Sequence, residues 1–99
     1  MKILIIDDEK LICDSIRQIL QFSGFSNVSV CYDALQGEAE LNKNIYDVAF
    51  IDLIMPQKHG NEILETAKKN GIKTEFIVLT AVKDIPMVVR CLKAGAFNY

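Results

Sequence analysis

The chain alternates short apolar runs with longer segments in which apolar residues recur every three or four positions. Four of the runs are rich in β-branched residues and predict β-strands at Ile3–Ile6, Val28–Cys31, Val48–Ile51 and Phe76–Leu79. Three of these are continuously apolar, which is typical of parallel strands that are covered by helices on both faces. Val28–Cys31 has a serine in its middle and therefore resembles an edge strand.

Between these runs, apolar residues at helical spacing predict helices. The patterns cover residues 12–20, 33–43, 63–67 and 85–94. Gly24 and Asn70-Gly71 follow two of the patterns, and a residue in the left-handed conformation commonly ends a helix at such a place. Asp84 is a candidate cap for the last pattern, and Pro86 suits its first turn. Strands and helices in alternation predict right-handed crossovers and an α/β fold with a doubly wound parallel sheet.

Composition narrows the class of protein. The chain has 99 residues, of which 51% are hydrophobic and 24% charged, and residues 1–99 are expected to form one domain. A net charge of −2 without a basic block argues against non-specific nucleic-acid binding. No apolar run has the length of a membrane span, so we expect a cytoplasmic protein without a membrane partner. Three widely spaced cysteines predict buried, reduced thiols rather than a disulfide or a zinc site.

Acidic residues gather at the predicted carboxyl ends of the strands. Asp7, Asp8 and Glu9 follow the first strand, Asp52 follows the third, and Thr80 follows the fourth. Ligands of open parallel sheets bind at this edge, so we expect the side chains to meet there. Crowded carboxylates repel unless a cation neutralises them, and a set of oxygen ligands favours Mg²⁺ or Mn²⁺, the usual partners of phosphoryl transfer. In the plainer alternative, Asp7 and Asp8 only cap the first helix and Asp52 only begins a loop.

Four motifs stand in order along the chain. They are K-I-L-I-I-D-D-E at 2–9, F-I-D-L-I-M-P at 50–56 followed by Gly60, V-L-T-A at 78–81 and K-A-G-A-F-N-Y at 93–99. Together they resemble the receiver domain of bacterial two-component response regulators, over the whole chain. The resemblance implies a flavodoxin-like sheet with strand order 2-1-3-4. It also implies a signalling function in which a sensor histidine kinase donates a phosphoryl group.

The resemblance further implies a role for each matching residue. Asp52 would accept the phosphoryl group, in a domain that dephosphorylates itself slowly and is not a turnover enzyme. Asp8 and Asp52 would bind Mg²⁺ or Mn²⁺ directly, Asp7 would act mainly through a water, and Ile54 would contribute its main-chain carbonyl. Thr80 would donate its hydroxyl to a phosphoryl oxygen.

Other residues near these motifs have plainer interpretations. Tyr99 falls at the family's aromatic switch position, but an ordinary core or edge aromatic fits it equally well. Thr80 could satisfy its hydroxyl on a nearby carbonyl. His59, the only histidine, is expected to be solvated in a loop, and Lys58 beside it is expected to be a surface charge.

The end of the printed chain departs from the family pattern. Tyr99 precedes the positions of the family's lysine and last helix, so we expect a receiver with its fifth strand and last helix largely missing. An output domain, through which alone nucleic acid would be bound, is expected in a longer protein. Without the lysine, phosphorylation of Asp52 should be slow. The exposed strand at 76–79 and the helix at 85–94 predict a homodimer.

Two alternatives use the same residues. A degenerate receiver would serve only as a surface for protein interaction or dimerisation. A phosphohydrolase of the haloacid dehalogenase type would also use an aspartyl nucleophile with Mg²⁺, but that family has D-x-D-x-T after its first strand, where this chain has Asp7-Asp8-Glu9. The kinase, the signal and the output are not specified by any motif.

Overall fold

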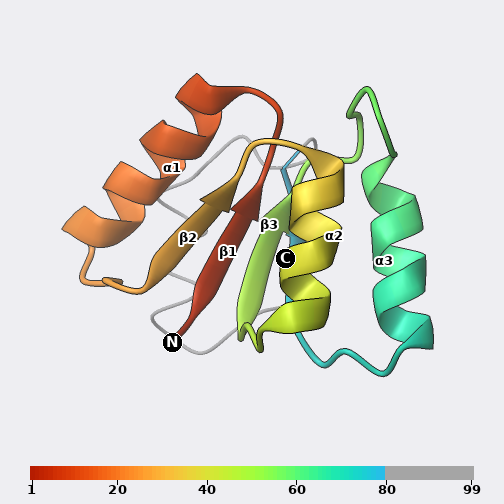
Figure 1. Cartoon of the computed structure of the whole chain (residues 1–99). Helices are drawn as coiled ribbons and strands as arrows, with labels where there is room; N and C mark the ends of the chain where they lie inside the picture. The colour runs from red at the N-terminus through yellow and green to blue at the C-terminus, as the bar shows by residue number, and fades with distance from the viewer. Residues whose placement is uncertain (80–99) are drawn as a thin grey trace.

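Strands and helices alternate in the computed structural model of the chain, which describes residues 1–79. In chain order these elements are β1 Ile3–Ile6, α1 Lys10–Phe22, β2 Val28–Cys31, α2 Ala34–Lys43, β3 Val48–Ile51, α3 Gly60–Lys69 and β4 Glu75–Val78. The four strands are parallel and form one sheet in the order β2-β1-β3-β4 (Figure 1). The predicted α/β class and strand order are confirmed.

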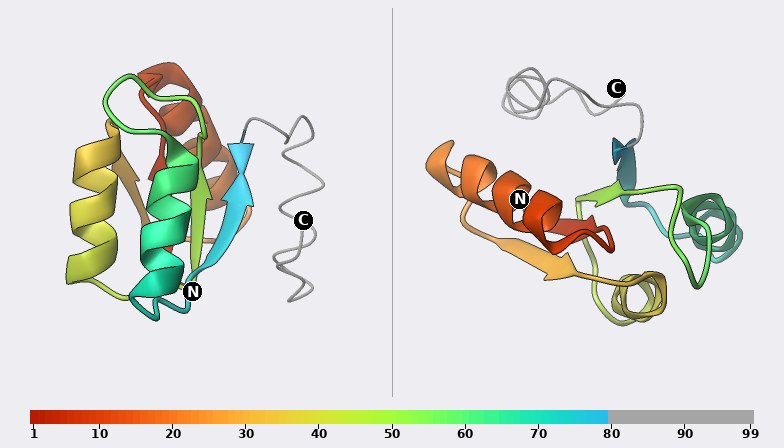
Figure 2. Two further views of the ribbon diagram at one scale, coloured as in Figure 1. Left: turned by 90° about the vertical axis from the view of Figure 1, so that its right-hand side faces the viewer. Right: turned by 90° about the horizontal axis from the view of Figure 1, so that it is seen from above.

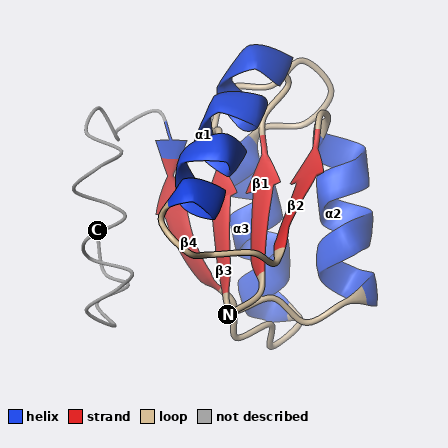
Figure 3. Ribbon diagram, turned by 90° about the vertical axis from the view of Figure 1, so that its left-hand side faces the viewer, coloured by secondary structure: helices blue, strands red, loops and turns tan. Residues whose placement is uncertain are grey.

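The sheet lies between two helical layers. Helix α1 covers one face, and α2 and α3 lie side by side on the other (Figures 2 and 3). Alternate residues of β1 therefore enter different cores. Ile3 and Ile5 pack with α1, whereas Leu4 and Ile6 pack with α2 and α3, and all four side chains are fully buried. Burial on both faces explains why these strands are apolar throughout.

The ends of the elements differ slightly from the prediction. Strand β4 begins and ends one residue earlier than expected, at Glu75 and Val78, because Glu75 pairs with Val48 at the start of β3. Gly24 has a φ of +100° and Gly71 a φ of +71°, so both glycines adopt the left-handed conformation predicted for them after a helix. The predicted helix at 85–94 lies outside the described residues.

Helix α2 is held close to the sheet at a glycine. Gly37 is buried, and a Cβ atom there would lie 2.7–2.9 Å from side-chain atoms of Ile6. The helix starts at a conventional cap, because the Asp33 carboxylate accepts the backbone N–H of Gln36 at 2.8 Å. The glycine that weakens the helical pattern of the sequence is thus the residue that lets α2 approach β1.

The described cysteines are buried thiols, as expected. Cys13 and Cys31 are free, and burial raises the pKa of Cys13 to about 12 and that of Cys31 to about 11. Both therefore remain protonated near neutral pH. Within residues 1–79, no helix has both the length and the apolar character needed to cross a membrane.

Candidate functional site

The acidic residues lie at the carboxyl edge of the sheet, where two neighbouring strands end at the same level. Ile6 of β1 pairs with Ile51 of β3. The next residue on each strand continues the arrangement, since the Asp52 N–H donates to the Ile6 carbonyl at 3.0 Å and the Asp7 N–H donates to the Cys31 carbonyl at 3.2 Å. The backbone thus fixes the position of both aspartates.

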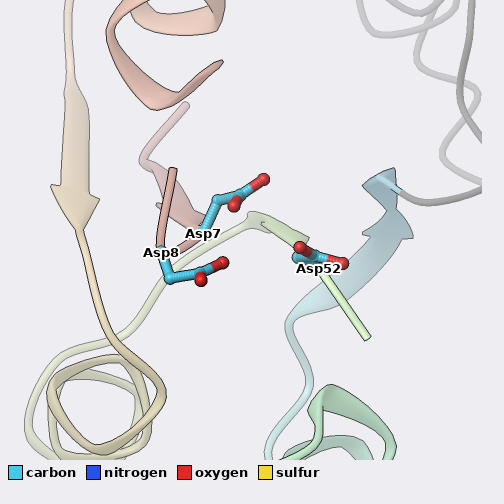
Figure 4. A group of neighbouring side chains, drawn as sticks. All are labelled: Asp7, Asp8 and Asp52. Carbon is cyan, nitrogen blue, oxygen red and sulfur yellow. The ribbon is translucent and has the colours of Figure 1, made fainter. Parts of the chain in front are cut away.

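Three carboxylates meet at this edge. One oxygen from each of Asp7, Asp8 and Asp52 can be chosen so that all lie within 4.8 Å of one another (Figure 4). Asp7 is buried, Asp52 is half-buried and Asp8 is exposed. The structure therefore brings together the three side chains that the sequence places at the strand ends, along a gradient from the interior to the solvent.

The surroundings of Asp7 disfavour the ionised form of its carboxyl group. Its pKa is raised from the ordinary 3.8 to about 6, chiefly because burial removes water from the carboxylate. The N–H of Glu9, which donates to Asp7 Oδ1 at 3.0 Å, lowers the pKa, while the negative charges of Asp52 and Asp8 raise it. A buried carboxylate with two anionic neighbours is a set that a hard divalent cation stabilises, and oxygen ligands suit Mg²⁺ or Mn²⁺.

The alternative in which these aspartates only shape turns is partly realised. Asp7 accepts the Glu9 N–H just before α1, and Asp52 Oδ1 accepts the N–H of Ile54 at 3.0 Å. Each of these bonds uses one carboxylate oxygen and leaves the second oxygen of the same group outside the turn contact. The turn contacts orient the carboxylates without accounting for the three charges that converge.

The loop that follows Asp52 is anchored at several points. Met55 is buried in the core under α2 and α3, and the Gly60 N–H donates to the Leu53 carbonyl at 2.9 Å. Ile54 exposes 71% of its surface, so its side chain points away from the protein and a role for this residue would fall to its main chain.

Gly60 allows a close contact between the loop and the site. A Cβ atom on Gly60 would meet the carbonyl oxygen of Asp52 and lie 2.8 Å from the Cα of Leu53. Both contacts are with backbone atoms, which cannot move aside as a flexible side chain can. Gly60 is thus required by the packing of the start of α3 against the backbone of Asp52.

An ion pair that the sequence did not reveal joins this loop to a helix. Lys58, expected to be a surface charge, donates from Nζ to Glu38 Oε2 of α2 at 2.7 Å. The partners are 20 residues apart, so no local spacing indicates the pair. His59 is exposed, as expected, and precedes α3 without a side-chain capping bond. Thr80 and Tyr99 lie outside the described residues.

Comparison with known proteins points to one family. A family model described as the response regulator receiver domain matches residues 3–99. The chain is 32% identical, over 98% of its length, to 43% of the probable C4-dicarboxylate response regulator DctR of Priestia megaterium. It is 30% identical, over its full length, to 44% of the transcriptional regulatory protein DltR of Streptococcus agalactiae. The chain thus spans less than half the length of these curated relatives.

Solved structures give the same result. A CheY-like response regulator receiver domain protein from Methanospirillum hungatei is 35% identical, with a TM-score of 0.75 over 96% of this chain and 75% of that one. The receiver domain of the Francisella response regulator 1452 is 31% identical, with a TM-score of 0.77 over 99% of this chain and 80% of that one. Sequence and fold therefore agree over nearly the whole chain.

Proposed function

The chain belongs to the family of response regulator receiver domains, and from this we propose that Asp52 accepts a phosphoryl group from a sensor histidine kinase. Receiver domains are signalling domains of two-component systems and not turnover enzymes. The observation that carries the proposal is the convergence of Asp7, Asp8 and Asp52 at the carboxyl edge of a parallel sheet.

The local geometry supports Asp52 as the nucleophile. Its Oδ1 is oriented by the Ile54 N–H, which leaves Oδ2 to form the bond to phosphorus as the phosphorus–nitrogen bond of a phosphohistidine breaks. The leaving imidazole keeps the electron pair of that bond, and Asp52 becomes an acyl phosphate. Slow attack of water on the acyl phosphate would return the carboxylate.

Asp8 and Asp52 would hold Mg²⁺ or Mn²⁺ directly, with Asp7 acting mainly through a water and Ile54 through its main-chain carbonyl. Bound there, the cation supplies positive charge against the oxygens of the incoming phosphoryl group. The raised pKa of Asp7 supports this assignment, because a nearby cation would stabilise the carboxylate against the burial and the neighbouring negative charges that raise the pKa.

The remaining parts of the proposal concern residues and regions outside those described. Thr80 would donate its hydroxyl to the phosphoryl group, and Tyr99 would report the change as an aromatic switch.

A homodimer through the β4 edge and residues 85–94 would be seen as twice the monomer mass in sedimentation equilibrium, and a purely monomeric profile would contradict it. Curated relatives named transcriptional regulatory proteins support control of transcription as the output, and we propose a cytoplasmic location.

Beryllofluoride, an analogue of the phosphoryl group, tests the central step. The melting temperature of the chain should rise with Mg²⁺ and rise further when beryllofluoride is added, since ligands of the folded state stabilise it. Asp52→Asn should abolish the second rise. Asp47→Asn is the matched control, because Asp47 precedes β3 at the opposite end of the sheet and accepts the Lys2 N–H at 2.7 Å.

The same titration separates the alternatives. An unchanged response of Asp52→Asn to beryllofluoride would contradict the proposed acceptor. No response of the wild type to either Mg²⁺ or beryllofluoride would indicate a degenerate receiver. Steady release of phosphate from small phosphate esters would instead indicate a phosphohydrolase.

A further inference from the structure

The loop of residues 53–59, which joins β3 to α3, begins at the proposed phosphoryl acceptor and carries the proposed main-chain ligand. The start of the loop is fixed by the Ile54 N–H on Asp52 Oδ1, and its end by the Gly60 N–H on the Leu53 carbonyl. The side chain of Met55 secures the middle in the core. None of these contacts connects the far side of the loop, residues 56–59, to another element.

The ion pair between Lys58 and Glu38 makes that connection. Its atoms lie 2.7 Å apart, and the side chains expose only 27% and 22% of their surface. The other salt bridge within residues 1–79, between Arg17 and Asp14, is longer at 3.4 Å, more exposed, and joins residues of a single helix. Partial burial reduces screening by solvent, so the loop pair is the more strongly coupled of the two.

The anchor of this pair lies on α2, next to a close contact between that helix and the sheet. Glu38 directly follows Gly37, the buried residue at which α2 packs against Ile6 of β1. Ile6 is in turn the last residue of β1, immediately before Asp7 and Asp8. Through Glu38 and Lys58, the loop that starts at Asp52 is therefore held against α2, the helix that contacts the last residue of β1 before the other two carboxylates.

We propose that Lys58 and Glu38 are positioning residues that hold the loop of residues 53–59 in the conformation required for divalent-cation binding. This inference rests on the proposed function of the acidic cluster. Neither side chain would touch the cation; the pair limits the movement of the loop, and thereby that of Ile54, whose N–H orients the Asp52 carboxylate. Loss of the pair should therefore weaken cation binding while all the ligands remain present.

Mn²⁺ binding to the full chain tests the inference, with free Mn²⁺ measured by its electron paramagnetic resonance signal. Lys58→Met and Glu38→Gln should each weaken binding by about five-fold, on the scale of a partly exposed ion pair. The double variant should be no weaker than either single variant, because the two changes remove the same contact. Lys58→Arg, and the exchange of charges in Lys58→Glu with Glu38→Lys, should recover most of the affinity.

Arg17→Met is the matched control, since it removes the Arg17–Asp14 ion pair, which lies within α1. It should leave the affinity for Mn²⁺ within about two-fold of the wild type. Melting temperatures in EDTA show whether a variant is simply less stable. A loss of Mn²⁺ affinity at an unchanged melting temperature supports the positioning role, whereas a loss of affinity that follows a lower melting temperature would assign the pair to the stability of the fold and overturn the positioning role.

The outcomes distinguish this inference from the function on which it rests. If the wild type binds Mn²⁺ and Asp52→Asn does not, but Lys58→Met binds as the wild type does, the positioning role is wrong and the proposed site stands. Additive losses in the double variant would also overturn the positioning role. If the wild type fails to bind Mn²⁺, the cation site and the positioning role are both wrong.

Discussion

Replacement of Asp7 by asparagine should stabilise the metal-free protein at neutral and alkaline pH. The Asp7 side chain is only 2% exposed, and its pKa is raised to about 6, first by burial and also by the charges of Asp52 and Asp8. Asparagine has nearly the same shape without the charge. It can also accept the Glu9 N–H that Asp7 Oδ1 accepts at 3.0 Å.

The sign and size follow from the proton balance. Between pH 3.8 and about 6 the folded protein holds the Asp7 proton, whereas the unfolded chain releases it. Ionisation of Asp7 therefore costs the folded state free energy as the pH rises through this window, and the cost is complete above it. A pKa shift of one unit corresponds to about 1.4 kcal/mol. The free energy of unfolding of Asp7→Asn should therefore exceed that of the wild type by about 3 kcal/mol near pH 8 and by almost nothing near pH 4.

Urea unfolding in EDTA, followed by far-ultraviolet circular dichroism, measures this gain. The difference in the free energy of unfolding between Asp7→Asn and the wild type should grow between about pH 4 and about pH 7. Asp47→Asn, at the other end of the sheet, should not reproduce this growth. Saturating Mg²⁺ should shrink the difference, because the cation relieves the charge on Asp7 in the wild type.

Two results would contradict the predicted stabilisation by Asp7→Asn. A metal-free Asp7→Asn protein less stable than the wild type near pH 8 would mean that the Asp7 charge is compensated in the fold. A stabilisation that does not change with pH would mean that the gain comes from packing or from the turn, and not from ionisation.

Two further substitutions test the packing around the site and at the opposite end of the sheet. In urea unfolding, Gly60→Ala should destabilise the fold by about 2 kcal/mol or more, and it should also weaken Mg²⁺ binding, because the added Cβ meets the backbone of Asp52. An unchanged Mg²⁺ affinity of Gly60→Ala would contradict this assignment. Tyr46→Phe should cost about 1–2 kcal/mol, because the buried hydroxyl donates to the Glu40 carboxylate at 2.6 Å, and an unchanged urea midpoint would show that the bond contributes nothing.

The position of the carboxylates could be predicted from the sequence because it depends only on where the strands end and on which strands are neighbours. Apolar runs locate the strands, and parallel strands bring all their carboxyl ends to one edge. Asp7, Asp8 and Asp52 therefore had to face the same side of the molecule. The resemblance to receiver domains then supplied the strand order that makes β1 and β3 neighbours, which periodicity alone does not determine.

The contacts around the carboxylates could not be predicted in the same way. Lys58 and Glu38 meet because α2 and the loop after β3 lie at a particular height on the sheet, and no local pattern encodes that height. Gly37 lowers the helix propensity of the α2 segment, but helix propensity describes an isolated helix and ignores the approach of Ile6. The pKa of Asp7 likewise depends on burial, which distinguishes it from Asp8 next to it.

The two strand ends of the site thus contribute in different ways. The end of β1 carries a buried charge that the metal-free fold tolerates at a cost of about 3 kcal/mol. The end of β3 leads into a loop secured by individual contacts, among them the Lys58–Glu38 pair. A cation that bridges Asp8 and Asp52 would relieve the charge on one side and fix the loop on the other. Metal affinity should therefore depend both on the repulsion that remains in the empty cluster and on the order of the loop, and the variants of Asp7 and Lys58 change these two quantities separately.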